Sequence, residues 1–305
     1  MLRGTVNKAL KKLSYRLRLT RSWAYPSVFQ IEATNFCNLR CPMCPYDTMT
    51  RDVGYMEIDL FRRVVDQLAG CTRVLRLHNM GESLFHKQID ELIRYARSKG
   101  VTTCISTNAT ALNEKAAERI LTAQLDRLFI SFDGAHKETY EMYRKGARFE
   151  RSLANVLRFL EIKEKQQAVK PHTTLSMIEM AGTEGEIGEF REFWQKRVDA
   201  IRIKRVGNWD GSIDRINEIA LKDSRPPDAP PCSWLWDRMV VLWDGRVVPC
   251  CYDYDGKYVL GNLRERTLKQ IFNDQPMREL RKLHAAGRAD ESSLCRGCAQ
   301  VRTHI

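Results

Sequence analysis

The sequence predicts an α/β protein in which six strand–helix units form a partial, TIM-like (β/α)6 barrel, followed by a small C-terminal α+β domain. Two observations support this prediction. Strand-like and helix-like patterns alternate from residue 28 to residue 206, and a proline-rich stretch at 226–231 separates them from a shorter segment with a hairpin signal. We therefore divide the 305 residues into an N-terminal arm (1–27), a barrel domain (28–225) and a C-terminal domain (226–305).

The alternating segments have the lengths expected of buried strands and amphipathic helices. The expected strands span residues 28–33, 73–80, 102–107, 127–132, 172–180 and 200–206. The helices between them span residues 58–69, 88–98, 113–123, 152–166 and 187–197. In the C-terminal domain, strands at 239–243 and 246–249 flank Asp244-Gly245, and short helices follow at 268–272 and 277–284. Such alternation implies parallel strands, and ligands gather at the C-terminal ends of parallel strands.

The N-terminal arm reads as a basic amphipathic helix. Its apolar positions recur at helical spacing and are Leu2, Val6, Leu10, Leu13 and Leu17. No acidic residue precedes Glu32, and the arm supplies seven positive charges of the net +12, so the body of the protein carries only about +5. This distribution gives no reason to expect nucleic-acid binding. We expect the apolar stripe to pack on the protein's own barrel, with peripheral contact to an anionic membrane or a partner as the alternative.

The ten cysteines favour metal or redox chemistry over a disulfide framework, because no membrane span or signal peptide is evident and we expect a cytoplasmic protein. Cys37, Cys41 and Cys44 directly follow the first strand with C-x3-C-x2-C spacing. Three thiolates so close can hold an iron–sulfur cluster, whereas ordinary four-iron clusters take four cysteines. Three ligands leave one iron open, as catalytic metal sites do. A structural zinc site and simple buried thiols are the alternatives.

Further motifs follow the other strands. Gly81-Glu82 comes after the second strand, Ser106-Thr107-Asn108 after the third, and Ser131-Phe132-Asp133-Gly134 after the fourth, leading to Tyr140 and Arg144-Lys145-Gly146. With the cysteine motif, these segments resemble the radical S-adenosylmethionine (SAM) superfamily over roughly residues 28–210. Ser83 stands where the family often has proline, and Ala109 where it has glycine.

The resemblance implies a [4Fe–4S] cluster held by Cys37, Cys41 and Cys44, with SAM bound at the open iron and cleaved to a 5′-deoxyadenosyl radical. Glu82 would accept the amino group of SAM, and Arg144 would pair with its carboxylate, because a guanidinium fork matches a carboxylate. The other expected cofactor contacts are Met43, Gly81, Ser106, Asn108, Ser131 and Asp133. A flavodoxin- or ferredoxin-type protein would supply the electron.

A second set of cysteines lies in the C-terminal domain and comprises Cys232, Cys250, Cys295 and Cys298. Their spacing alone suits zinc and an iron–sulfur cluster equally well. The order of these cysteines around the hairpin resembles the twitch, or abbreviated SPASM, domain of radical SAM enzymes. That resemblance implies one auxiliary [4Fe–4S] cluster with four cysteine ligands, which has no open iron and would conduct electrons.

Twitch-bearing relatives include aminoglycoside dehydrogenases and epimerases, so we expect hydrogen abstraction from a hydroxyl-bearing carbon of a carbohydrate or similar small molecule. Cys251 could return a hydrogen atom from the opposite face and give an epimer, with Cys104 as a second candidate donor. Without a donor, loss of a proton, to a base such as Lys204, and of an electron would give a ketone. Two alternatives remain: peptide modification, which a longer N-terminal recognition domain would favour, and a non-enzymatic iron–sulfur carrier or scaffold.

Overall fold

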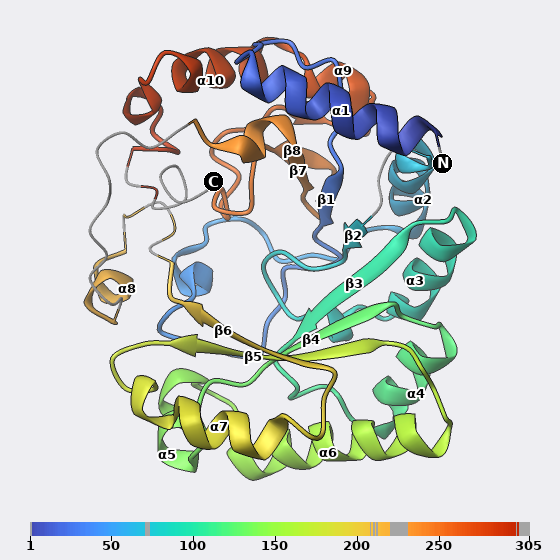
Figure 1. The fold of residues 1–305 in the computed structure, drawn as a ribbon, viewed down its shortest axis with the longest axis vertical. Coiled ribbons are helices and arrows are strands. Elements are labelled where there is room, and N and C mark those ends of the chain that lie inside the picture. Colours follow the sequence, from blue (N-terminus) through green and yellow to red (C-terminus); the bar gives the residue numbers. More distant parts are fainter. Residues whose placement is uncertain are drawn as a thin grey trace.

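A computed structural model describes residues 2–70, 74–207, 209, 211, 213–219, 231–296 and 298, and its framework is one nine-stranded sheet (Figure 1). The strands lie in the order β6-β5-β4-β3-β2-β1-β7-β8-β9. The first six pair in parallel and are β1 (Val28–Ile31), β2 (Val74–Arg76), β3 (Thr102–Thr107), β4 (Arg127–Ser131), β5 (His172–Glu179) and β6 (Ala200–Arg205). This arrangement confirms the expected partial barrel.

Helices cover the outer, convex face of the parallel strands (Figure 1). They are α2 (Ile58–Leu68), α3 (Ile89–Ser98), α4 (Glu114–Thr122), α5 (Lys137–Tyr143), α6 (Phe149–Lys165) and α7 (Ile187–Trp194). Sequence patterns did not predict α5 or α8 (Asp214–Ile219), since short helices carry too few apolar positions for a clear period. β2 is shorter than predicted, because the chain leaves the sheet after Arg76 and forms a loop. The Ser83 hydroxyl stabilises this loop by donating to the Leu77 carbonyl at 2.6 Å.

Alternation along each strand separates the outer core from an inner, concave face. Phe29, Ile31 and Leu75 are fully buried against the helices. Their neighbours point the other way, and the parallel register aligns Gln30 with Arg76 on this inner face. Side chains of the inner face are therefore polar or charged at many positions where the outer face is aliphatic.

The C-terminal region extends the same sheet. β7 (Arg238–Val241) pairs in parallel with β1, and β8 (Arg246–Val248) and β9 (Gly261–Asn262) follow antiparallel, so the predicted hairpin is present. α9 (Leu268–Phe272) and α10 (Gln275–Ala285) cover this part. Hydrogen bonds from a buried ion pair of the barrel hold it in place. Both terminal guanidinium nitrogens of Arg51 bond to the carboxylate of Glu32 at 2.8 Å. Arg51 Nε donates to the Tyr254 carbonyl at 2.8 Å, and the Trp243 N–H donates to Glu32 at 3.3 Å. The proposed domain boundary at 226–230 lies outside the described residues.

α1 (Leu2–Arg16) corrects one expectation, because three apolar positions of the stripe, Val6, Leu13 and Leu17, do not pack on the barrel. The helix contacts the C-terminal region through its polar side: Lys11 pairs with Asp237 at 2.7 Å, and Tyr15 meets the Trp236 ring edge-on. Val6, Leu13 and Leu17 remain 53%, 42% and 55% exposed. Periodicity identified the apolar positions correctly, but the opposite side of α1 carries the hydrogen-bonding groups that fit its neighbours. No helix among the described residues is long and apolar enough to cross a membrane.

Candidate active site

The loop after β1 gathers the first three cysteines and is fixed by hydrogen bonds to its backbone. Cys37 donates its N–H to the Tyr46 hydroxyl at 3.0 Å, and the Cys44 N–H donates to the Cys41 carbonyl at 3.0 Å. The Arg215 guanidinium donates to the carbonyls of Pro42 and Cys44. Burial, together with the nearby Cys41 thiol, raises the pKa of Cys37 to about 11 and that of Cys44 to about 12. Both thiols are therefore protonated at neutral pH, and binding of a metal centre would release their protons.

Gly81 and Glu82 lie against this loop. Gly81 has φ of +83°, and a Cβ there would lie 2.6 Å from the Thr34 carbonyl, so only glycine allows this approach. Glu82 is 2% exposed, and its carboxylate accepts the backbone N–H of Asn108 at 2.6 Å and of Leu84 at 3.2 Å. Burial raises the pKa of Glu82. The carboxylate has unused lone pairs beside the cysteine loop and can accept an ammonium group.

The turn after β3 adjoins the same cysteines. Asn108 Nδ2 lies 3.8 Å from Cys37 Sγ and 3.2 Å from Asn38 Oδ1. Ala109 takes a left-handed conformation with φ of +65°, which explains why glycine is usual at that position. Ser106 and Ser131 are half-buried on the inner face, at the ends of β3 and β4. Met43 is 5% exposed, and its carbonyl accepts the indole N–H of Trp209 at 3.1 Å.

Arg144 and Asp133 form a buried ion pair next to Cys41. The Ile178 N–H donates to Asp133 at 2.7 Å, which holds the carboxylate in place. Burial lowers the pKa of Arg144, but the charges of Asp133 and Cys41 outweigh burial and raise it overall. Arg144 Nε is buried and has no hydrogen-bond partner among the described residues. This free donor next to the cysteine loop fits an anionic group of a ligand, while Asp133 is already committed to orienting Arg144.

The second cysteine set is gathered as well. Cys232, Cys295 and Cys298 are 7–8% exposed, and burial with the charges of the other thiols raises the pKa of Cys250 well above its usual value. Cys232 donates its N–H to His284 Nδ1 at 3.4 Å, and His284 Nε2 lies 3.3 Å from Cys295 Sγ. Because Nδ1 accepts, the ring proton belongs on Nε2, which donates to sulfur.

The inner face of the sheet carries Cys104, Lys204 and Cys251. Cys104 is 2% exposed, and Cys251 packs half-buried against Val240 and its neighbours. Burial and the positive charges of nearby arginines lower the pKa of Lys204 to about 8. Arg76 lies within electrostatic range of both thiols and of Lys204, which places the three groups around one region. Asn208 and Asp210, two polar residues that follow β6 in the sequence, lie outside the described residues.

Two family models match the regions that contain the two cysteine sets. Residues 31–178 match the radical SAM superfamily, and residues 232–299 match the SPASM model, described as an iron–sulfur cluster-binding domain. The chain belongs to the radical SAM superfamily. Membership implies SAM and a [4Fe–4S] cluster as cofactors, and the SPASM match implies auxiliary iron–sulfur chemistry in the C-terminal domain.

Individual radical SAM proteins give a broader picture. An AdoMet-dependent heme synthase of Methanosarcina barkeri is 31% identical, over 43% of this chain and 38% of its own length. An S-adenosyl-L-methionine-dependent 2-deoxy-scyllo-inosamine dehydrogenase of Niallia circulans is 22% identical over 90% of this chain and 93% of its own. The structure of Streptococcus suis SuiB bound to precursor peptide SuiA has a TM-score of 0.70 at 14% identity, covering 97% of this chain and 74% of SuiB. That likeness concerns the fold.

The donor sets fit iron–sulfur clusters better than a single metal ion. Within the described ranges, no three His, Cys, Asp or Glu side chains converge closely enough to hold one ion. A cluster spreads its ligands over several irons, so its cysteines stand further apart than those around zinc. The radical SAM domain adds the free Nε of Arg144 and the open carboxylate positions of Glu82, which suit the carboxylate and amino groups of SAM.

Sequence reasoning missed several residues that lie close to the two cysteine sets or support the loops around them. His284 has no motif, and only the fold brings it to Cys232 and Cys295. Arg215 follows the last barrel strand and Arg51 lies within a loop. Neither belongs to a sequence motif with a characteristic spacing, so no sequence pattern indicated its role. A basic residue near a cysteine loop was the only available signal, and such residues are common on surfaces.

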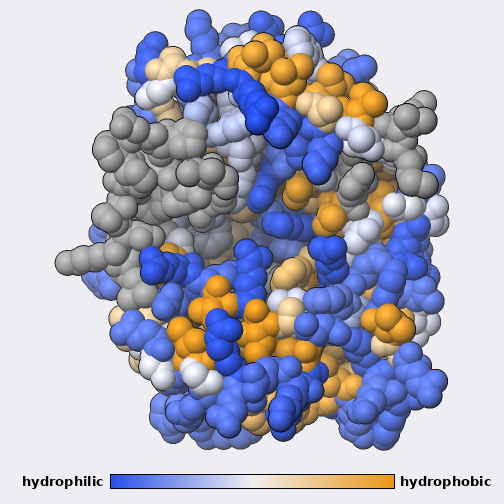
Figure 2. All heavy atoms as spheres, in the orientation of Figure 1, coloured by the Kyte–Doolittle hydropathy of each residue, from blue (hydrophilic) through white to orange (hydrophobic). Residues whose placement is uncertain are grey.

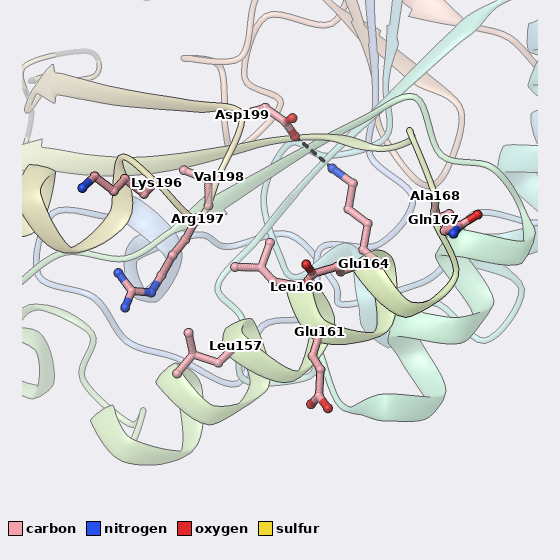
Figure 3. A pocket seen from close by; sticks show the side chains of 11 residues that line it. Leu157, Leu160, Glu161, Glu164, Gln167, Ala168, Lys196, Arg197, Val198 and Asp199 are labelled. Carbon is pink, nitrogen blue, oxygen red and sulfur yellow. Dashed lines mark hydrogen bonds and ion pairs between the residues drawn. The ribbon is translucent and has the colours of Figure 1, made fainter.

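The largest cavity described, about 680 Å³, lies elsewhere (Figure 3). It sits between the C-terminal part of α6 and the segment before β6, and it includes the Lys163–Asp199 ion pair at 3.0 Å. This position is at the N-terminal end of β6, whereas the cysteine loop follows the C-terminal end of β1. The cavity therefore has no part in the radical SAM site.

Proposed function

We propose that the protein is a radical SAM enzyme that removes hydrogen from a hydroxyl-bearing carbon of a carbohydrate or similar small molecule, giving a ketone or an epimer. SAM bound at the first cluster would supply the 5′-deoxyadenosyl radical. The observation that carries the proposal is that Lys204, Cys104 and Cys251 all lie within electrostatic range of Arg76 on the inner face. The dehydrogenase of Niallia circulans, which aligns over 90% of this chain, supports the same reaction class.

Each inner residue has a distinct task in this proposal. With a pKa of about 8, Lys204 is partly neutral at mildly alkaline pH and can accept the hydroxyl proton of a substrate radical. The electron then leaves toward the C-terminal cysteines and a ketone results. If Cys251 instead gives its thiol hydrogen to the opposite face of the carbon, the product is an epimer and Cys251 is left as a thiyl radical. One electron from the flavodoxin- or ferredoxin-type reductant and one proton would then restore the thiol. Asp133 holds Arg144, and Glu82 is held by backbone N–H groups, so both are preorganised to orient SAM.

Labelled substrates test the reaction class. Anaerobically reconstituted, reduced enzyme is incubated with SAM, a flavodoxin- or ferredoxin-type reductant and a panel of carbon-deuterated sugars and cyclitols. Transfer of deuterium into 5′-deoxyadenosine with a ketone product indicates dehydrogenation; an inverted carbon carrying solvent hydrogen indicates epimerisation. Deuterium transfer only from peptide substrates would refute the proposal and favour peptide modification. Absence of any SAM cleavage would leave a carrier or scaffold role.

Two cysteine variants separate the roles of the cysteine sets. Cys44→Ala should abolish SAM cleavage, because the first cluster loses one of its three ligands. Cys295→Ala should lower the iron content yet retain slow cleavage uncoupled from product. Full cleavage in Cys44→Ala would contradict the assignment of the first cluster.

We also propose that α1 contacts an anionic membrane surface. Val6, Leu13 and Leu17 share one side of the helix, and Trp23 is 56% exposed beyond its end. Exposed basic residues, Lys8, Lys12, Arg16, Arg18 and Arg21, surround this stripe. Figure 2 shows the hydrophobic atoms near the top of the view, where α1 runs, next to strongly hydrophilic ones. Apolar insertion combined with basic charge is the usual design of an interfacial helix.

Vesicle flotation tests this contact. The protein should float with phosphatidylglycerol-containing vesicles and not with pure phosphatidylcholine vesicles, and Leu13→Gln with Leu17→Gln should remove the binding. Val169→Gln is the matched control, because Val169 is 90% exposed but lies outside α1. No flotation of the unaltered protein would overturn the proposal.

A further inference from the structure

Two arginines on the inner face make no ion pair with any residue that the structure describes. Arg76 ends β2 and Arg238 begins β7, and these two strands flank β1 on either side. The parallel register places both side chains on the inner face with Val28 and Gln30. Neither arginine makes an ion pair or a side-chain hydrogen bond with another described residue, and Arg238 Nε is buried without a partner. The Trp234 ring lies 4.0 Å from the Arg238 guanidinium and holds it in place.

The charges around these two arginines are mainly positive and do not neutralise them. Arg76, together with burial, lowers the pKa of both Arg238 and Lys204, so the three cations lie close enough to repel one another. The neighbouring carboxylates are occupied elsewhere: Asp237, whose charge reaches Arg238, pairs with Lys11. Asp133 pairs with Arg144, and Glu32 pairs with Arg51. Half-buried guanidinium groups without a counter-ion are unfavourable, and a ligand anion would remove this cost. Figure 2 shows the surface hollowed near its centre, where a ligand could enter.

We propose that Arg76 and Arg238 bind a phosphate group of the substrate, which makes the substrate a phosphate-bearing polyol such as a sugar phosphate or sugar nucleotide. This inference rests on the function proposed above and defines its substrate class. Two guanidinium forks match the several oxygens and the nearly double charge of a phosphate better than a single carboxylate. Both arginines lie within electrostatic range of Cys251. A phosphate held there brings the sugar ring to Cys251 and Lys204.

A second explanation must be separated from this one. Arg238 also lies within electrostatic range of Cys232, so it could balance the negative charge of a cluster in the C-terminal domain. In that case substitution would alter the cluster and leave phosphate binding unchanged. The test therefore measures binding and cluster properties on the same samples.

Calorimetric titration of the anaerobically reconstituted enzyme with SAM present tests the proposal at constant ionic strength. The probes are inorganic phosphate, glucose 1-phosphate, glucuronate and glucose. We expect saturable phosphate binding, and glucose 1-phosphate should bind at least tenfold more tightly than glucuronate or glucose. Arg76→Gln and Arg238→Gln should each weaken binding of both phosphates at least tenfold. Arg94→Gln, an equal charge change on exposed α3, should leave it unchanged.

The contrary outcomes are distinct. Equal affinity for glucose 1-phosphate and glucose, or unaltered phosphate affinity in both variants, would overturn the proposal, and equal affinity for glucuronate would replace phosphate by carboxylate. If Arg238→Gln loses iron, Arg238→Lys, which keeps the charge but not the fork, provides the comparison. Binding requires no turnover, so phosphate selectivity without deuterium transfer would contradict only the reaction. Turnover of neutral polyols without phosphate selectivity would contradict only this inference.

Discussion

His284 bridges two cysteines of the C-terminal domain, and its removal should make the reduction potential of the cluster there more negative. Its Nδ1 accepts the Cys232 N–H, which directs the Nε2 proton to Cys295 Sγ at 3.3 Å. The ring is 2% exposed, so water cannot replace this bond. An N–H donor to a ligand sulfur stabilises the more negative, reduced state of a cluster more than the oxidised state.

The size of the shift follows from the strength of one such bond. A hydrogen bond to a charged acceptor contributes roughly 1.5–3 kcal/mol. The added electron is shared among several sulfurs, so the bond to one of them strengthens by only a fraction of that, on the order of 0.5–1 kcal/mol. Since about 1.4 kcal/mol corresponds to about 59 mV in a one-electron couple, His284→Leu should lower the potential by about 20–45 mV.

Redox titration followed by electron paramagnetic resonance measures this potential on the iron-replete enzyme. His284→Gln keeps an N–H donor and should recover part of the shift. His136→Gln is the control, because His136 directly precedes α5 and its side chain is 52% exposed; this substitution should leave the potential unchanged. An unchanged potential, within about 10 mV, in a His284→Leu protein of full iron content would refute the reasoning.

Three other predictions follow from buried charge and backbone strain. Arg51→Ala should lower the free energy of unfolding by about 3–5 kcal/mol because it leaves Glu32 buried without a counter-charge, while Arg158→Ala, on the exposed surface, should change it much less. Equal losses in urea denaturation would contradict this. Measured kcat/KM should rise with pH through about 8 as Lys204 becomes neutral, and Lys204→Gln should abolish that rise; an unchanged pH profile in the variant would show that Lys204 is not the base. Gln167→Gly should raise the free energy of unfolding by about 0.5–1 kcal/mol, because φ at Gln167 is +51° and glycine adopts this conformation without strain. A lower free energy of unfolding would show that the side chain contributes more than the strain costs.

The parts predictable from sequence were those determined by local patterns. β3 begins and ends where the apolar pattern placed it, at Thr102 and Thr107. Motifs at the ends of successive strands had to converge, because parallel strands bring their C-terminal ends to one edge. Cys37, Glu82 and Asn108 meet in this way, although 26 positions separate the last two.

What the sequence could not reveal depends on how distant surfaces fit together. The pairing of Glu32 with Arg51 joins a strand to a loop and has no characteristic spacing. α1 shows a related limit: its period identified the apolar positions, yet Lys11 and Tyr15 on the opposite side found partners in the C-terminal region. A helical period shows where each side chain lies around the helix axis. It does not show which face of the helix packs against the rest of the protein.

The parallel pairing of β1 with β7 sets the relation between the two cysteine sets. Cys37 follows β1 after a short loop, and Cys250 follows β8, the antiparallel neighbour of β7. Both sets thus depend on neighbouring strands of one hydrogen-bonded sheet, and the hydrogen bond from Arg51 Nε to the Tyr254 carbonyl adds a second tie. Substrate binding cannot change their separation without breaking this ladder. The inner face between them is therefore preorganised, and selectivity among substrates must come from its fixed side chains rather than from movement of one domain against the other.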